Sequence, residues 1–234
     1  MKRALLALCA ALLLSLLALA EPAQAATWRR LQTAHFTFVG DASEAQIRQV
    51  AEQLERFRTV MALALPNLST VSPVPTVVVV FSSDRAFDPY KPRFEGRRVE
   101  AAGYFQNGED VNYIAVNADV GSAVADVVLH EYTHFLIGNT FGIVPVWLNE
   151  GLAEFYGTVV GSKGGRAAII GTAPRAHVDL LRQSTFIPLG QLMTIDRASP
   201  MYNEGSRRGV FYAEAWALTH YLTLGSPERR AQFQ

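Results

Sequence analysis

The sequence contains a single cysteine, Cys9, which lies in an apolar N-terminal stretch that we expect to be removed on export. The rest of the chain can therefore form no disulfide bond, no thiolate-ligated metal site and no thiol nucleophile. Any metal ion that this protein binds must be held by His, Asp or Glu side chains.

The chain also lacks an excess of charge of either sign, with 21 basic and 21 acidic residues. Loss of Lys2, Arg3 and Glu21 with the N-terminal stretch leaves 19 basic and 20 acidic residues. This balance gives no reason to expect nucleic acid or an anionic membrane surface as a partner. Long apolar runs are missing after residue 25, so we expect no stable membrane span in the mature chain.

Residues 1–25 have the pattern of a secretory signal. A basic start is followed by the Leu/Ala-rich run Ala4–Ala20 and by the small-x-small sequence Ala23-Gln24-Ala25. The pattern predicts cleavage after Ala25 and a secreted, periplasmic or cell-envelope protein. The alternatives are an uncleaved membrane anchor and a lipoprotein, but most of the apolar run follows Cys9, the residue that a lipoprotein would acylate.

Residues 26–234 are enough for one domain with a sizeable core. Alternating or β-branched runs predict strands at 28–39, 76–81, 101–105 and 111–116. Helical spacing and capping residues predict helices at 43–65, 122–138, 145–157, 174–183, 188–194 and 207–224, with a glycine loop at 161–165. We therefore predict an α+β fold, with a strand-rich lobe at about 26–120 that holds an antiparallel or mixed sheet and a helical lobe at about 121–234.

The helix predicted at 122–138 carries the motif H-E-x-x-H at residues 130–134. Because an α-helix turns once in about 3.6 residues, His130 and His134 project from one face and can grip one metal ion. Glu131 points about a third of a turn away, so it is a candidate general base rather than a ligand.

The next predicted helix offers Glu150 as the third ligand. A loop at 138–144 would let this helix fold back against the first one. Gly151 costs a helix about 1 kcal/mol relative to alanine, which makes sense if another backbone approaches closely there. His, His and Glu complete a catalytic site for one Zn²⁺ at the junction of the lobes. The alternative for Glu150 is a solvated helix carboxylate.

Two further residues are candidates for supporting roles. Glu154 lies one turn after Glu150 and could accept the outer ring N–H of His130 or His134; the alternative is a surface glutamate. Tyr212 is a candidate donor to the oxyanion of a tetrahedral intermediate, but it could equally extend a core stripe. His177 and His220 are more typical of solvent-facing or core positions than of ligands, and no role is assigned to His35.

HEYTH at 130–134 followed by WLNEGLAEFYG at 147–157 resembles the gluzincin clan of zinc metallopeptidases, especially the bacterial peptidase-MA-like proteins. The resemblance implies a zincin-like fold, zinc binding by His130, His134 and Glu150, and Glu131 as the catalytic base. Aminopeptidases of the clan carry G-x-M-E-N for the free amine of the substrate, and residues 103–107 lack its Met and its acid. Relatives often continue into helical repeats, so the chain could be a fragment.

The sequence thus predicts an exported zinc endopeptidase acting on a peptide or protein, whose extended backbone could pair with an edge strand at 111–116. Two alternatives stay open. One is a zinc-stabilised envelope binding or assembly module without turnover, and the other is a zinc hydrolase of a non-peptide amide or ester.

Overall fold

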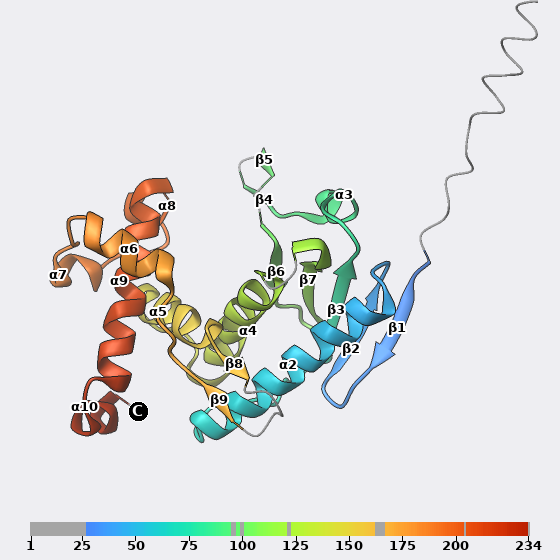
Figure 1. The fold of residues 1–234 in the computed structure, drawn as a ribbon, viewed down its shortest axis with the longest axis horizontal. Helices are drawn as coiled ribbons and strands as arrows, with labels where there is room; N and C mark the ends of the chain where they lie inside the picture. The colour runs from blue at the N-terminus through green and yellow to red at the C-terminus, as the bar shows by residue number, and fades with distance from the viewer. Residues whose placement is uncertain are drawn as a thin grey trace, which may run out of the picture.

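The computed structural model describes residues 27–94, 97–98, 101–120, 123–161, 167–203 and 205–233. The predicted signal at 1–25, the predicted helix cap Ser122 and most of the predicted glycine loop lie outside these residues. The chain has the predicted α+β architecture, with a mixed sheet in the first half and mostly helices in the second (Figure 1). Within the described residues, no helix combines the length and apolar character that a bilayer span requires.

The main sheet has five strands in the order β1-β2-β3-β7-β6. Their bounds are Arg29–Gln32 for β1, Phe36–Gly40 for β2, Thr76–Phe81 for β3, Gly103–Gln106 for β6 and Asn112–Asn117 for β7. Strands β2, β3 and β7 run parallel, and β1 and β6 are antiparallel to their neighbours. Short two-stranded pairs are formed by β4 (Arg93–Phe94) with β5 (Arg97–Arg98), and by β8 (Val160–Gly161) with β9 (Ala168–Ile169).

The sheet corrects the prediction about its edge. The strand predicted to pair with substrate, at 111–116, is β7, and it lies between β3 and β6 with both sides hydrogen-bonded. The edge strand on this side of the sheet is β6. The hairpin pattern correctly predicted that β6 pairs with β7. A hairpin pattern shows that two strands pair, but it does not show which of them takes a third strand on its other side.

The longer helices are α2 (Glu44–Ala64), α4 (Ala123–Phe141), α5 (Val146–Gly157), α6 (Arg175–Gln183) and α9 (Gly205–Leu224). The shorter ones are α3 (Asp84–Phe87), α7 (Leu189–Leu192), α8 (Pro200–Asn203) and α10 (Pro227–Phe233), with single 3-10 turns at Asp88–Tyr90 and Ala118–Val120. The predictions missed α3, α8 and α10. They also treated the second half as purely helical, whereas the structure adds the β8–β9 hairpin there.

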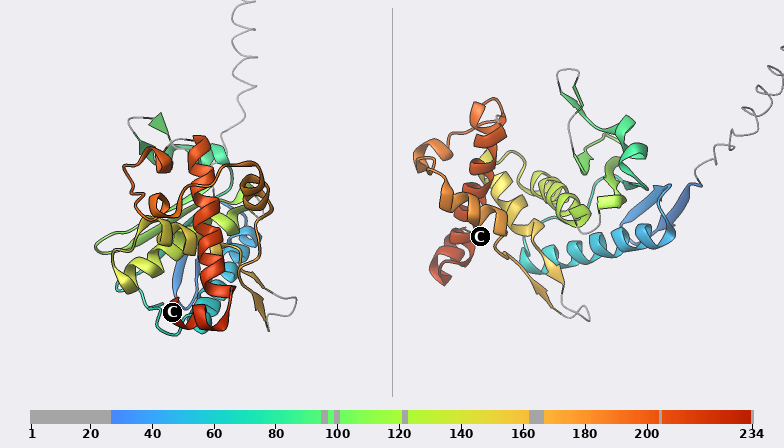
Figure 2. Two further views of the ribbon diagram at one scale, coloured as in Figure 1. Left: turned by 90° about the vertical axis from the view of Figure 1, so that its left-hand side faces the viewer. Right: turned by 45° about the horizontal axis from the view of Figure 1, so that its top comes forward.

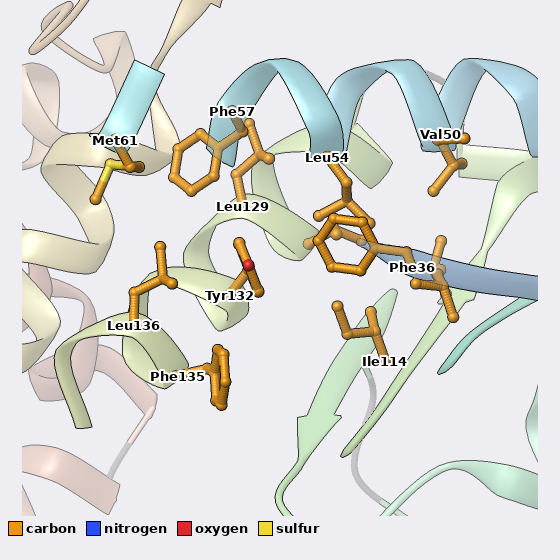
Figure 3. Packing of buried hydrophobic residues seen from close by; sticks show 14 of the residues in the cluster. Phe36, Val50, Leu54, Phe57, Met61, Ile114, Leu129, Tyr132, Phe135 and Leu136 are labelled. Carbon is orange, nitrogen blue, oxygen red and sulfur yellow. The ribbon is translucent and has the colours of Figure 1, made fainter. Parts of the chain in front are cut away.

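Helix α4 lies between the two lobes and packs against α2 and the sheet on one side and α5 on the other (Figure 1). Its sequence is apolar on nearly all faces, as expected for a helix covered on both sides. Figure 3 shows α2 lying over α4, with Tyr132 of α4 among the core side chains. The Tyr132 ring meets Phe36 of β2 and Phe57 of α2 edge-on, at centroid distances of 5.5 and 6.2 Å. This core fixes the helix that carries the H-E-x-x-H motif.

Helix α4 runs three residues past its predicted end. The prediction ended it at Gly138, but the helix continues to Phe141 and ends at Gly142, whose φ of 68° lies in the left-handed region. The Gly142 N–H donates to the Gly138 carbonyl at 3.0 Å and closes the last turn. A glycine inside a helix, such as Gly138, lowers helix stability only modestly and need not end the helix. A helix end with positive φ, as at Gly142, favours glycine strongly.

Helix α9 runs beside α5 at the end of the molecule opposite β1 (Figure 2). A Cβ atom at Gly151 would lie closer to the Ala215 carbonyl oxygen and the Thr219 hydroxyl than real Cβ atoms do. The prediction that another backbone approaches Gly151 is therefore confirmed. This contact holds the turn of α5 that carries Glu150 against α9, the helix that carries Tyr212.

Candidate metal centre

His130, His134 and Glu150 meet where α4 and α5 cross. The His130 and His134 Nε2 atoms lie 3.1 Å apart. Glu150 Oε2 lies 3.5 Å from the first and 3.3 Å from the second. The three side chains form a group that could hold a metal ion, with ligand atoms within 4.8 Å of one another. The predicted convergence of these residues is confirmed, whereas their role as ligands stays a prediction.

Glu150 carries an unsatisfied oxygen at the centre of this group. The residue is only 3% exposed, and its Oε2 has no hydrogen-bond partner among the described residues. Leaving a charged group buried without compensation is costly, and several kcal/mol per ion is a typical order of magnitude. A cation between the carboxylate and the two imidazoles would satisfy this oxygen, so the donor set fits a divalent metal.

The electrostatics keep this carboxylate ionised. Burial acts to raise the pKa of Glu150, but the two imidazoles outweigh burial and hold the pKa well below its ordinary value. For His130, burial acts to lower the pKa, and the contacts with Glu150 and Glu154 outweigh it and raise the pKa. The site therefore has a net attraction for positive charge, whether it is a proton or a metal ion.

Glu131 lies beside the group and is not one of its three members. It lines the same cleft as His130, His134 and Glu150. Burial raises the pKa of Glu131 above its ordinary value, and the charges of His130 and His134 offset this only in part. A partly buried carboxylate with raised proton affinity is suited to accept a proton at neutral pH and to return it.

Two tyrosines line the cleft beside the group. The Tyr202 hydroxyl of α8 donates to Glu150 Oε1 at 3.0 Å. The Tyr212 ring of α9 stacks on His130 at 6.3 Å and on Tyr202 at 6.1 Å. Burial, followed by the charge of Glu150, raises the pKa of Tyr212 well above its ordinary value, so its hydroxyl remains a donor. Tyr212 was a predicted candidate and its role as an oxyanion donor stays a prediction, whereas Tyr202 was missed because the single turn that starts at Pro200 gives no periodic signal.

Glu154 lies behind His130, one of the two histidines that it was predicted to support. Its Oε1 lies 3.5 Å from His130 Nδ1, and its Oε2 lies 2.9 Å from Nε2 of His177 on α6. The alternative, a surface glutamate, does not fit, because the Glu154 side chain is only 22% exposed. His177, expected to be a solvent-facing or core residue, instead contacts the Glu154 carboxylate at the back of the metal group.

The remaining histidines lie elsewhere. His35 pairs with Glu55 of α2 at 2.6 Å. His220 packs against Trp216 and Phe155 at centroid distances of 5.1 and 6.0 Å. Neither belongs to the group around Glu150.

Open clefts lie on two sides of this group. One has a volume of about 760 Å³ and extends from the group toward Phe105 and Asn107 at β6, and toward the α4–α5 loop and Arg197. The other, of about 590 Å³, extends toward α6 and the start of α9. His130, Glu131 and Tyr212 line both clefts. An extended ligand could thus pass the metal group and leave on either side.

Comparison with known proteins adds one similarity. Residues 124–233 match the model of a family described as "Protein of unknown function (DUF1570)". The matched segment includes all the residues of the metal group together with Tyr202 and Tyr212. No curated protein matches the chain.

Proposed function

We propose that this protein is an exported zinc-dependent endopeptidase with a zincin-like fold, similar to the gluzincin clan. The observation that carries the proposal is the convergence of His130, His134 and Glu150 beside Glu131 in an open cleft. A site that only stabilises the fold has no need of the fourth residue, Glu131.

The distances are compatible with zinc as the ion. Tetrahedral bonds of about 2.0–2.1 Å place neighbouring ligand atoms about 3.3–3.4 Å apart. The separations in the group, 3.1, 3.5 and 3.3 Å, scatter around this value. Two imidazoles and one carboxylate leave a fourth position for water, as catalytic zinc sites do.

A zinc ion held by His130, His134 and Glu150 would make water acidic and polarise a carbonyl group. Glu131 accepts the proton of the attacking water and later delivers it to the leaving amine. The Tyr212 hydroxyl donates to the carbonyl oxygen as negative charge develops on it. The Tyr202 hydroxyl holds the Glu150 carboxylate in place by donating a hydrogen bond to Oε1, the oxygen that does not face the imidazoles.

The clefts support internal cleavage of a polypeptide. Strand β6 is the sheet edge nearest the group, and Phe105 and Asn107 line the larger cleft. A sheet edge can pair with an extended backbone. The segment at 103–107 lacks an acid that would select a free amino terminus, and clefts on both sides leave room for chain beyond the scissile bond.

Replacing Glu131 with Gln tests the mechanism. The variant should bind zinc as tightly as the unaltered protein, because Glu131 is not a ligand. It should lose peptide hydrolysis by about 10²–10⁴-fold, because the proton acceptor is gone. Metal content and cleavage of a proteome-derived peptide library provide the two measurements. Glu52→Gln, at an exposed position of α2, is the matched control and should leave both unchanged.

Hydrolysis by Glu131→Gln at the original rate would refute this mechanism. A protein that binds zinc but cleaves no peptide would favour a zinc-stabilised binding module or a hydrolase of another amide or ester. The proposal of export is tested separately, by sequencing the amino terminus of the chain recovered outside the cytoplasm; Ala26 is the expected first residue.

A further inference from the structure

The two histidines of the metal group differ in what holds their outer ring nitrogens. His130 Nδ1 faces Glu154 at 3.5 Å, whereas His134 Nδ1 is buried with no hydrogen-bond partner among the described residues. The orientation and tautomer of a ligating imidazole depend on the partner of its outer nitrogen. Of the two rings, His130 is therefore the one that a neighbouring carboxylate can orient.

The Glu154 carboxylate is itself held from the other side by His177. His177 Nε2 lies 2.9 Å from Glu154 Oε2, and the His177 ring packs on Trp216 of α9 at 6.0 Å. The side chains of His130, Glu154 and His177 are only 18%, 22% and 18% exposed. Water competes less for such half-buried contacts than for surface ones.

We propose that His177 is a positioning residue, which acts through Glu154 to orient His130 toward the metal ion. Three helices that are separate in sequence contribute one side chain each: α4, α5 and α6. The inference rests on the proposed function only in taking His130 as a metal ligand. It assigns a role to α6, a helix that buries none of its own residues fully.

The test measures metal affinity rather than peptide cleavage. His177→Ala should weaken Zn²⁺ binding by about 10-fold in competition with a chelator, near the lower end of the effects seen when an outer partner of a ligand is lost. It should also shift the visible absorption of the Co²⁺-loaded protein, since His130 would meet the ion at a different angle. His177→Gln, which keeps an N–H donor, should recover most of the affinity.

His220→Ala is the matched control. His220 also packs on Trp216, at 5.1 Å, and no hydrogen bond links it to Glu154 among the described residues. Its loss should leave Zn²⁺ affinity and the Co²⁺ spectrum unchanged, even if thermal stability falls. If both alanine variants lower the stability of the metal-free protein and neither changes affinity, His177 is merely a packing residue and the proposal is wrong.

A double-mutant cycle tests the route through Glu154. In a Glu154→Gln background, His177→Ala should cause almost no further loss of Zn²⁺ affinity, because the intermediary is already gone. Additive losses would overturn the proposed route. A protein that binds Zn²⁺ with this pattern of affinities but cleaves no peptide would refute the endopeptidase and support the positioning role. If the unaltered protein cleaves peptides but His177→Ala binds Zn²⁺ with unchanged affinity, the endopeptidase is supported and the positioning role is refuted.

Discussion

Glu150 is fixed in place by a contact that leaves one of its oxygens available. Oε1 accepts the Tyr202 hydroxyl at 3.0 Å, while Oε2 faces the two imidazoles. A carboxylate held by one oxygen loses less conformational freedom when its other oxygen binds a metal ion. Tyr202 would thus hold Glu150 ready for a metal ion without occupying the oxygen that faces the imidazoles.

Tyr202→Phe should weaken Zn²⁺ binding by about 10-fold, the lower end of the range for partners of metal ligands. The substitution removes one hydroxyl and keeps the ring that stacks on Tyr212. Chelator competition measures the change. Tyr221→Phe, an exposed α9 tyrosine whose ring contacts Arg229, should leave affinity unchanged. Equal affinity in the two variants would show that Tyr202 does not support Glu150.

The local residue pattern was sufficient to predict His130, Glu131 and His134, because their relation depends only on the pitch of one helix. Glu150 needed the further assumption that the next helix folds back. The contacts of Tyr202 and His177 leave no trace in the local residue pattern. Tyr202 lies 52 residues after Glu150, and His177 lies 23 residues after Glu154. No local spacing predicts contacts over such separations.

Helices α5 and α9 approach each other closely at Gly151, one residue after Glu150. The Ala215 carbonyl and the Thr219 hydroxyl occupy the space that a side chain would need. The position of Glu150 therefore depends on how closely these two helices pack.

Gly151→Ala should lower the free energy of unfolding by about 1–3 kcal/mol, because overpacking must push the helices apart. Gly138→Ala is the matched control, since the added Cβ meets no atom within 4 Å. It should raise stability by up to about 1 kcal/mol through helix propensity alone. Urea unfolding of both variants measures the difference. A Gly151→Ala protein as stable as Gly138→Ala would contradict the close approach.

The clefts combine contributions from both lobes. Strand β6 borders the larger cleft, while α6 and α9 border the other, and the metal group lies between them. A substrate chain that occupies both clefts would have no terminus near the scissile bond.

Peptides with acetylated and amidated ends should therefore be cleaved at rates within about threefold of the free-ended peptides, since neither charged terminus contributes to binding. Mass spectrometry of matched capped and free peptides gives the comparison. Peptides truncated to two residues are the control and should be poor substrates, because they forfeit binding on one side. Strong selection for peptides with a free terminus would show that the protein is an exopeptidase and not an endopeptidase.

By itself the sequence determined the α+β class, the principal helices and strands, and the pairing of His130 with His134 on one face of α4, because these depend on periodicity and on contacts between near neighbours. Only the tertiary structure decided that β6 rather than β7 is an edge strand, that Tyr202 and His177 reach Glu150 and Glu154, and that clefts open on both sides of the group. These features arise where distant segments pack together. The free energy of such contacts depends on the shapes of both partners, which no single stretch of sequence contains.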